Sequence, residues 1–110
     1  MDQQYKEKNI RWIKMKKVML ICNAGMSTGI LAKKIQSASN GTLEVHAYAE
    51  AEYADFLDGV DLILVSPQIR FLADDIKEKS QKEVKTIAPQ KYGMMDGKGI
   101  YEDIKKYWGE

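Results

Sequence analysis

The sequence contains one cysteine, Cys22, within the stretch VMLICNAGMSTG at residues 18–29, where an apolar run gives way to small residues. Glycines and small side chains let consecutive backbone N–H groups point inward around an anion, and the start of a following helix adds its positive dipole end. The same field favours thiolate over thiol, which makes Cys22 a candidate nucleophile. We therefore predict a phosphate-binding loop made of the seven residues that follow the cysteine: Asn23, Ala24, Gly25, Met26, Ser27, Thr28 and Gly29.

Two familiar phosphate loops do not fit this stretch. A nucleotide-binding P-loop needs the pattern G-x-x-x-x-G-K-[ST], and neither Gly25 nor Gly29 has the required partner glycine and lysine. A cysteine-dependent tyrosine phosphatase needs an arginine six residues after its cysteine, and Thr28 stands there. Without a guanidinium to stabilise the hydrolytic transition state, the loop is better suited to accept a phosphoryl group and pass it on. A low-molecular-weight phosphatase or arsenate-reductase-like enzyme stays an alternative, as does a module that senses phosphate without covalent chemistry.

The same residues also have plainer interpretations. A free cysteine is often a small buried hydrophobe, which is the alternative for Cys22. Ser27 and Thr28 can cap a helix as well as contact phosphate. His46, the only histidine, falls on the polar face of a predicted edge strand and is not expected to be catalytic. One cysteine and one distant histidine do not compose a metal site, so we predict neither a metal nor a cofactor.

Four stretches of the sequence predict the strands that would position this loop. Residues 18–21 and 62–65 are continuous apolar runs, which are typical of strands covered on both faces of a parallel sheet. Residues 43–48 alternate between apolar and polar side chains, as in a half-exposed edge strand. A fourth strand is predicted at residues 84–88, where a proline stops it.

The stretches between these strands have helical patterns. The first predicted helix has Ser27 or Thr28 as its cap and ends at Asn40-Gly41. Its apolar side is formed by four residues: Ile30, Leu31, Ile35 and Ala38. Further helices are expected at residues 50–57, 69–76 and 100–108. A glycine-rich turn around Gly97 and Gly99 should precede the last of them.

Strands that alternate with helices predict an α/β fold with right-handed crossovers. We expect a single doubly wound sandwich with a four-stranded parallel sheet in the order 2-1-3-4 and helices on both faces. In such sheets ligands bind beyond the carboxyl ends of the strands, here between the first and third strands, which end at Cys22 and at Ser66-Pro67-Gln68. Gln68 and Tyr92 should lie at this end and could border the site or contact a partner, although packing explains Tyr92 about equally well.

The composition limits the function classes further. A chain of 110 residues fits one domain, which we place at residues 17–110, after an N-terminal extension at residues 1–16. With 17 basic and 16 acidic residues the net charge is +1, which argues against a nucleic-acid partner. A lone cysteine cannot form an internal disulfide, and no apolar run approaches the ~20 residues that span a bilayer. We therefore expect a cytoplasmic protein without direct membrane insertion.

Three stretches carry a resemblance to a known family: residues 22–28 (CNAGMST), residues 66–69 (SPQI), and Tyr92-Gly93 with Asp96-Gly97. They resemble the IIB components of the lactose/cellobiose-type branch of the bacterial sugar phosphotransferase system. The resemblance extends from about Lys17 to the C-terminus and makes residues 17–110 an IIB-like phosphocarrier domain.

This resemblance implies an enzyme, a phosphotransferase that works through phosphocysteine. Cys22 would accept a phosphoryl group from a phosphohistidine on a IIA protein, while the backbone of residues 23–29 holds the phosphate. The group would then pass to a sugar, expected to be a β-linked disaccharide, held by a membrane IIC component. The protein would be peripheral to the inner face of the cell membrane through that partner.

Overall fold

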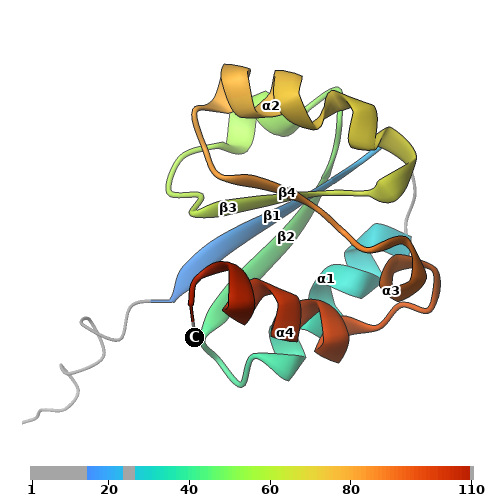
Figure 1. Ribbon diagram of the computed structural model, residues 1–110. Helices are drawn as coiled ribbons and strands as arrows, with labels where there is room; N and C mark the ends of the chain where they lie inside the picture. The colour runs from blue at the N-terminus through green and yellow to red at the C-terminus, as the bar shows by residue number, and fades with distance from the viewer. Residues whose placement is uncertain (1–14, 24–26, 110) are drawn as a thin grey trace, which may run out of the picture.

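The computed structural model, which describes residues 15–23 and 27–109, contains a four-stranded parallel sheet (Figure 1). The strands are β1 (Lys16–Cys22), β2 (Leu43–Ala49), β3 (Leu62–Val65) and β4 (Val84–Thr86). Their order is β2-β1-β3-β4, and the three neighbouring pairs are all parallel. The predicted fold class and strand order are confirmed.

The two central strands are buried on both faces, as their apolar runs predicted. Successive side chains of a strand point to opposite faces, so β1 and β3 contribute alternately to two clusters. The first cluster takes Val18 and Leu20, and the second takes Met19 and Ile21, all at most 1% exposed. Full burial of a side chain of this size stabilises the fold by about 1.5–3 kcal/mol. These strands are therefore the most firmly held part of the sheet.

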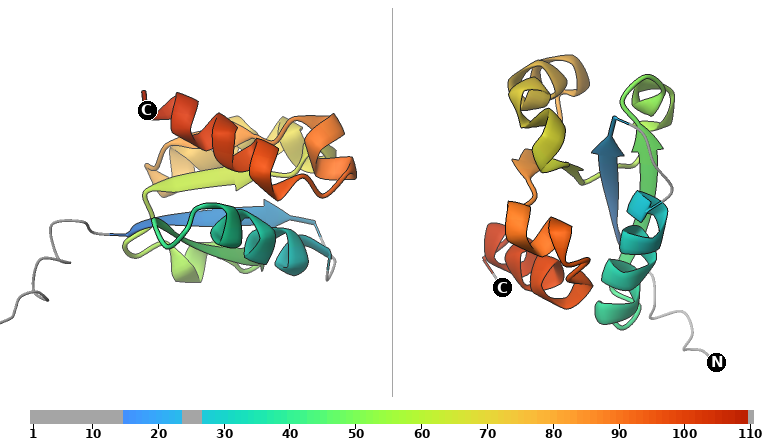
Figure 2. Two further views of the ribbon diagram at one scale, coloured as in Figure 1. Left: turned by 90° about the horizontal axis from the view of Figure 1, so that it is seen from below. Right: turned by 90° about the vertical axis from the view of Figure 1, so that its right-hand side faces the viewer.

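Helices cover both faces of the sheet (Figures 1 and 2). On the face of the first cluster, called here the α1/α4 face, lie α1 (Ser27–Ala38), α3 (Pro89–Gly93) and α4 (Gly97–Tyr107). The opposite face, called the α2 face, is covered by η2 (Tyr53–Phe56), η3 (Pro67–Leu72) and α2 (Ala73–Ser80). The crossovers therefore place α1 and α2 on opposite sides, which is the doubly wound arrangement.

Several predicted helices differ in detail from the structure. Ile30, expected on the apolar side of α1, is 55% exposed, because its neighbour Leu31 occupies the direction of the sheet and consecutive helical residues are about 100° apart. The helix expected at residues 50–57 is one short 3₁₀ turn, η2. The stripe at residues 69–76 is not one α-helix. Its first residue, Ile69, is non-helical inside η3, with φ and ψ of −120° and 26°, and α2 begins only at Ala73.

The C-terminal third also departs from the prediction. β4 ends at Thr86 instead of residue 88, although the N–H of Ile87 still donates to the carbonyl of Val65 at 2.9 Å. The proline after it begins the helix α3, which was not predicted. Gly97 and Gly99 lie inside α4 and not in a turn before it. Gly97 is needed for packing, because a Cβ there would lie 2.6 Å from the Cβ of Lys34 in α1.

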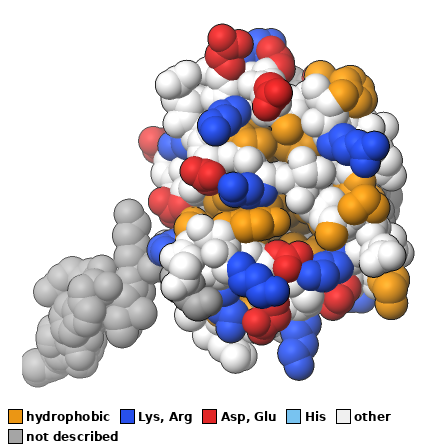
Figure 3. Space-filling model, viewed as in Figure 1, with side chains coloured by type: hydrophobic (Ala, Val, Ile, Leu, Met, Phe, Trp, Pro, Cys, Tyr) orange, Lys and Arg blue, Asp and Glu red, His pale blue; other side chains and the backbone are white. Residues whose placement is uncertain are grey.

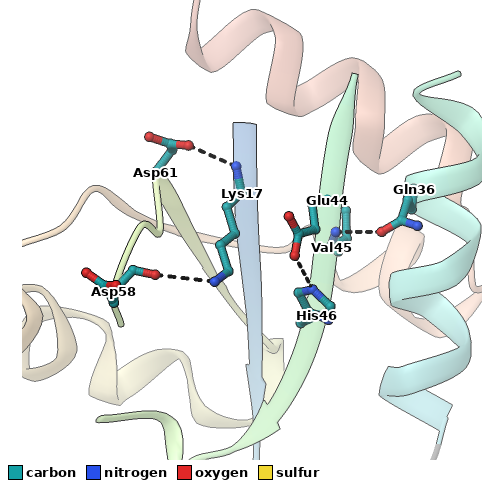
Figure 4. A network of polar contacts seen from close by, with 7 residues as sticks. All are labelled: Lys17, Gln36, Glu44, Val45, His46, Asp58 and Asp61. Atoms are coloured by element: carbon teal, nitrogen blue, oxygen red, sulfur yellow. Dashed lines mark hydrogen bonds and ion pairs between the residues drawn. The ribbon is translucent and has the colours of Figure 1, made fainter. Parts of the chain in front are cut away.

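Polar contacts fix the ends and the edge of the sheet (Figure 4). The backbone N–H of Lys17 donates to the carboxylate of Asp61 at 2.8 Å, and the N–H of Asp61 donates back to the carbonyl of Lys17 at 2.8 Å. On the edge strand, the N–H of Val45 donates to the side-chain carbonyl of Gln36 in α1 at 2.8 Å. These bonds hold β1 against β3 and α1 against β2, on either side of the strand that ends at Cys22.

Candidate functional site

The carboxyl ends of the strands bring together the segments that the sequence singled out. β1 ends at Cys22, α1 begins at Ser27, η3 follows Ser66, and α3 carries Tyr92. Figure 1 places the tip of β1, the start of α1 and the helix α3 at one end of the sheet. Several chain segments therefore meet where the site was predicted, at the carboxyl ends of β1 and β3.

Cys22 is held firmly by its backbone. Its carbonyl accepts the N–H of Glu50 at 2.7 Å, and it lies opposite Ala49 in the β1–β2 register. Its position in the strand alternation matches that of Val18 and Leu20, so its side chain belongs to the α1/α4 face. The sulfur therefore lies on the same face as the helix that begins five residues later.

The side chain of Cys22 is more buried than predicted. The residue is 3% exposed, and its Sγ lies 4.0 Å from the backbone carbonyl oxygen of Tyr48. A sulfur at an open rim, the arrangement that the nucleophile hypothesis favoured, is therefore not what the structure has. Burial by itself agrees with the alternative of a small structural hydrophobe. Cys22 differs from an ordinary core residue in its position, because it ends a strand and is followed five residues later by the start of α1.

The predicted phosphate loop is described only at its two ends. Asn23 is an exposed bend, and Ser27 is the first residue of α1. The predicted contacts of Ala24, Gly25 and Met26 fall on residues 24–26, which lie outside the described part of the chain. The inward-facing amides of the loop therefore stay a prediction.

Gly29 has no structural requirement for glycine in α1. A Cβ built on it meets nothing within 4 Å. A role of Gly29 in phosphate binding would therefore concern the access of a ligand to the helix and not the packing of the protein.

Thr28 and Tyr92 are brought together by the fold. Thr28 is 2% exposed, and its Oγ1 lies 3.4 Å from the Oη of Tyr92, with either hydroxyl able to donate. The half-buried Tyr92 also packs against the apolar cluster of the α1/α4 face. The packing interpretation of Tyr92 is therefore supported, because its ring lies against this cluster, and its hydroxyl also reaches the first turn of α1.

The helix that carries Tyr92 is anchored by an ion pair. Lys91 Nζ donates to both carboxylate oxygens of Asp103 in α4, each at 2.8 Å. This hydrogen bond is the main reason why the pKa of Lys91 is raised above its ordinary value. A charge-assisted, two-oxygen contact has a defined geometry, and it fixes α3, and with it Tyr92, against the longer α4.

Gln68 and His46 are the two other residues singled out in the sequence. Gln68 is exposed in η3. His46 pairs with Glu44 at 2.7 Å and is about half exposed, which confirms its placement on the polar face of β2 (Figure 4). Its register partner is Met19, three residues before Cys22, which is about 10 Å along the strand at about 3.3 Å per residue. His46 is therefore not assembled into the site.

One residue of this site was not predicted as functional. Ser66, directly after β3, is 0% exposed, and among the described residues its hydroxyl has no hydrogen-bond partner. Leaving a buried hydroxyl unpaired costs about 1–3 kcal/mol. In the sequence Ser66 is only a serine that ends an apolar run, and the surroundings of its hydroxyl become visible in the structure.

The described residues on the face of the molecule shown in Figure 3 form no area of a single charge. Lys, Arg, Asp and Glu are intermixed on the face seen in Figure 3, where they surround apolar side chains across its middle. A depression of about 640 Å³ lies between the end of α2 and the start of β4, at the opposite end of the sheet from Cys22. Its walls carry both charges: Asp74, Lys77, Glu78, Gln81, Lys82 and Glu83. No helix in residues 15–23 and 27–109 has the length and apolar character needed to cross a membrane.

Comparison with known proteins places these features in a family. Residues 17–103 match the family described as PTS system, Lactose/Cellobiose specific IIB subunit. The oligo-beta-mannoside-specific EIIB component of Bacillus subtilis is 31% identical over 94 residues, which cover 80% of this chain and 91% of that protein. The galactose-specific EIIB component of Lactococcus lactis subsp. cremoris is 34% identical over 93 residues, which cover 74% and 86%. The cellobiose-specific EIIB component of Lactococcus lactis subsp. lactis matches with the same identity and coverage.

Two solved structures share the architecture. The lactose-specific IIB domain from Streptococcus pneumoniae superposes with a TM-score of 0.75 over 86% of this chain and 99% of that one, at 18% identity, and this likeness concerns the fold. The cellobiose-specific IIB protein from Borrelia burgdorferi has a TM-score of 0.62 at 28% identity, over 80% of this chain and 86% of that one. The match therefore spans the sheet, its helices and the end of β1.

Proposed function

The chain belongs to the lactose/cellobiose-specific IIB subunits of the sugar phosphotransferase system, and from this membership we propose that it carries a phosphoryl group on Cys22. The donor is a phosphohistidine on a IIA protein, and the acceptor is a sugar bound by a membrane IIC component. The chain is thus a phosphotransferase subunit that works in the cytoplasm, at the inner face of the membrane through its IIC partner.

The proposed sugar is a β-linked disaccharide. Two of the matched relatives are named for oligo-beta-mannosides and for cellobiose, and a third is named for galactose. The first two names indicate β-linked sugars, which supports this substrate class for the present chain.

The chemistry consists of two in-line displacements at phosphorus. In the first, the Cys22 thiolate forms an S–P bond as the N–P bond of the phosphohistidine breaks, and the imidazole leaves as the neutral base after taking up a proton. In the second, a sugar hydroxyl forms an O–P bond as the S–P bond breaks, and the hydroxyl proton passes to a base or to solvent. The thiolate is regenerated, so the protein ends each cycle unchanged.

One observation carries this proposal: the only cysteine of the chain ends β1 at the switch point of the sheet, on the face of α1. Ligands of doubly wound sheets bind at this place, and the N-terminus of the following helix favours a negatively charged group. Backbone amides of residues 23–29 are proposed to neutralise the phosphoryl oxygens, and positioning of the two reactants supplies most of the rate.

The same features weigh against hydrolysis as the main activity. The sequence has no arginine between Cys22 and Arg70, so the loop lacks the bidentate donor that stabilises a hydrolytic transition state. A phosphatase would be revealed by steady turnover of a phosphate ester. A module that only senses phosphate would keep its full function in a Cys22→Ser variant.

A phosphorylation assay tests the proposal. The full chain is incubated with phosphoenolpyruvate, the general phosphoryl-transfer proteins of the system and a cellobiose-type IIA protein, and its intact mass is then measured. We expect one added phosphoryl group on the wild type and none on Cys22→Ser. His46→Gln is the matched control: it removes the only histidine and should be phosphorylated like the wild type. Labelling that survives in Cys22→Ser contradicts the proposal, and its loss in His46→Gln would point to the histidine instead.

A further inference from the structure

Ser66 has the burial of a core residue and the chemistry of a binding residue. It is 0% exposed, and its hydroxyl has no partner in residues 15–23 and 27–109. Buried polar side chains nearly always have a hydrogen-bond partner, so an unpaired one calls for a specific explanation. A ligand that binds next to it would provide the missing acceptor.

The ordinary explanation for a serine at this position does not apply. Ser66 is the residue before η3, and Pro67 follows it, so its side chain would be expected to cap the helical turn. The structure has no side-chain cap hydrogen bond there. Ser66 differs in this respect from the other two serines that are buried in the described part of the chain. Ser39 Oγ donates to the carbonyl of Gln36 at 2.6 Å, and Ser80 Oγ accepts the N–H of Lys82 at 3.1 Å.

The sheet places Ser66 directly beside Cys22. Ile21 and Val65 are register partners, and the N–H of Ser66 donates to the carbonyl of Ile21 at 2.9 Å. The next residues along the two strands are Cys22 and Ser66, on chains about 4.8 Å apart. The last register pair of β1 and β3 is Ile21 with Val65, and Cys22 and Ser66 follow it on the two adjacent chains.

Both side chains also belong to the same face. The φ and ψ of Ser66, −64° and 151°, are extended, so the alternation of β3 continues through it. Leu62 and Leu64 lie in the cluster of the α1/α4 face, and Ser66 follows them at the same spacing of two. Leu20 also belongs to that cluster, and Cys22 follows it at the same spacing of two residues. The thiol and the hydroxyl are thus adjacent on one face, at the switch point of the sheet.

We propose that the Ser66 hydroxyl is a hydrogen-bond donor to a phosphoryl oxygen on Cys22. This inference rests on the proposed phosphorylation of Cys22 and adds the residue that follows β3 to a site otherwise built from the chain after β1. A phosphoryl group on Sγ extends beyond the sulfur and brings charged oxygens toward the neighbouring strand. Hydrogen bonds to charged groups are the strong ones, particularly where water is excluded. The unpaired hydroxyl is then a hydrogen-bond donor already in place, and it gains its acceptor when Cys22 is phosphorylated.

The test is the equilibrium of phosphoryl exchange between a IIA protein and this chain. Ser66→Ala and Ser66→Gly both remove the hydroxyl, and each is expected to lower the equilibrium constant for loading Cys22 by about tenfold. Ser39→Ala is the matched control, since it removes a paired buried hydroxyl near the other end of the sheet and should leave this constant unchanged. Thermal unfolding shows which variants are folded, and Ser66→Ala should be at least as stable as the wild type because it removes an unpaired buried group.

A second measurement separates a contact with phosphoryl oxygen from a contact with the free thiolate. The rate of Cys22 alkylation by iodoacetamide is recorded against pH, and its profile should be the same in the wild type and in Ser66→Ala. The proposal is overturned by an unchanged loading constant in both Ser66 variants, or by a lower constant that comes with a shifted alkylation profile. A wild type that acquires no phosphoryl group would contradict the proposed function itself. A wild type that is phosphorylated to the same extent as its Ser66 variants would contradict only the proposed role of Ser66.

Discussion

Replacement of Gly97 by alanine tests how closely α4 must approach α1. The added Cβ would lie 2.6 Å from the Cβ, 2.7 Å from the carbonyl carbon and 2.9 Å from the carbonyl oxygen of Lys34. Carbon atoms in contact are about 3.5–4.0 Å apart, so the helices must separate by roughly 1 Å. Two of the three obstructing atoms belong to the backbone and cannot rotate away. The substitution therefore has to move a whole helix.

Two opposing effects determine the magnitude. Alanine is favoured over glycine in a helix interior by up to about 1 kcal/mol, whereas overpacking of a close-packed contact costs about 1–3 kcal/mol. We expect the packing cost to prevail and the free energy of unfolding to fall by about 1–2 kcal/mol. In a domain of this size, that loss corresponds to a decrease in melting temperature of roughly 4–16 °C.

Urea unfolding measures this effect against a matched control. Gly93→Ala, in α3, adds the same methyl group where nothing lies within 4 Å, so its stability should be unchanged or slightly increased. The midpoint of Gly97→Ala should shift to lower urea with an unchanged slope. A Gly97→Ala variant as stable as Gly93→Ala would refute the close contact between α1 and α4.

Three further predictions concern the surroundings of the site. Cys22, 3% exposed, should react with a bulky maleimide much more slowly in the native protein than in urea; equal rates would contradict its burial. Tyr92→Phe removes the hydroxyl that contacts Thr28 and should lower the free energy of unfolding by about 0.5–1.5 kcal/mol in urea titrations, whereas no loss would show that the contact is unimportant. The pKa of Lys91 is raised by its hydrogen bond to Asp103, so the folded state holds this proton more tightly than the unfolded state. The stabilising effect of the pair should be complete below pH 10.5 and be lost as the pH rises further; urea midpoints of wild type and Lys91→Met that do not converge there would contradict this.

The parts of the fold that depend on periodic burial could be predicted from the sequence. The apolar runs at residues 18–21 and 62–65 indicate strands with two covered faces, and β1 and β3 are those strands. The alternation at residues 43–48 indicates an edge, and β2 is the edge. These assignments put β1 and β3 in the centre of the sheet and β2 at an edge, as in the observed order β2-β1-β3-β4.

The parts that depend on a single tertiary contact could not be predicted. Gly97 and Gly99 resemble a turn, because the sequence does not show that Lys34 needs space against α4. Pro89 resembles a stop, yet proline is equally suited to the first position of a helix, and α3 begins with it. Ile30 looked like a core residue, and only the orientation of α1 on the sheet leaves it exposed.

For the candidate site, position was easier to predict than environment. The end of an apolar strand followed by small residues located Cys22, but its burial depends on chain segments that are distant in sequence. Thr28 and Tyr92 are 64 residues apart, and only the fold brings their hydroxyls together. Ser66 was predicted only as the end of the third strand, and its unpaired hydroxyl is visible only in three dimensions.

The most direct test is to locate the phosphoryl group within the chain. Trypsin should release residues 18–33 as one peptide, which contains Cys22 together with the hydroxyls of Ser27 and Thr28. After phosphorylation by the IIA protein, fragmentation of this peptide in a mass spectrometer assigns the group to one side chain. We predict that it is found on the sulfur of Cys22. A phosphoryl group on Ser27, on Thr28 or in another peptide would contradict the proposed role of the cysteine.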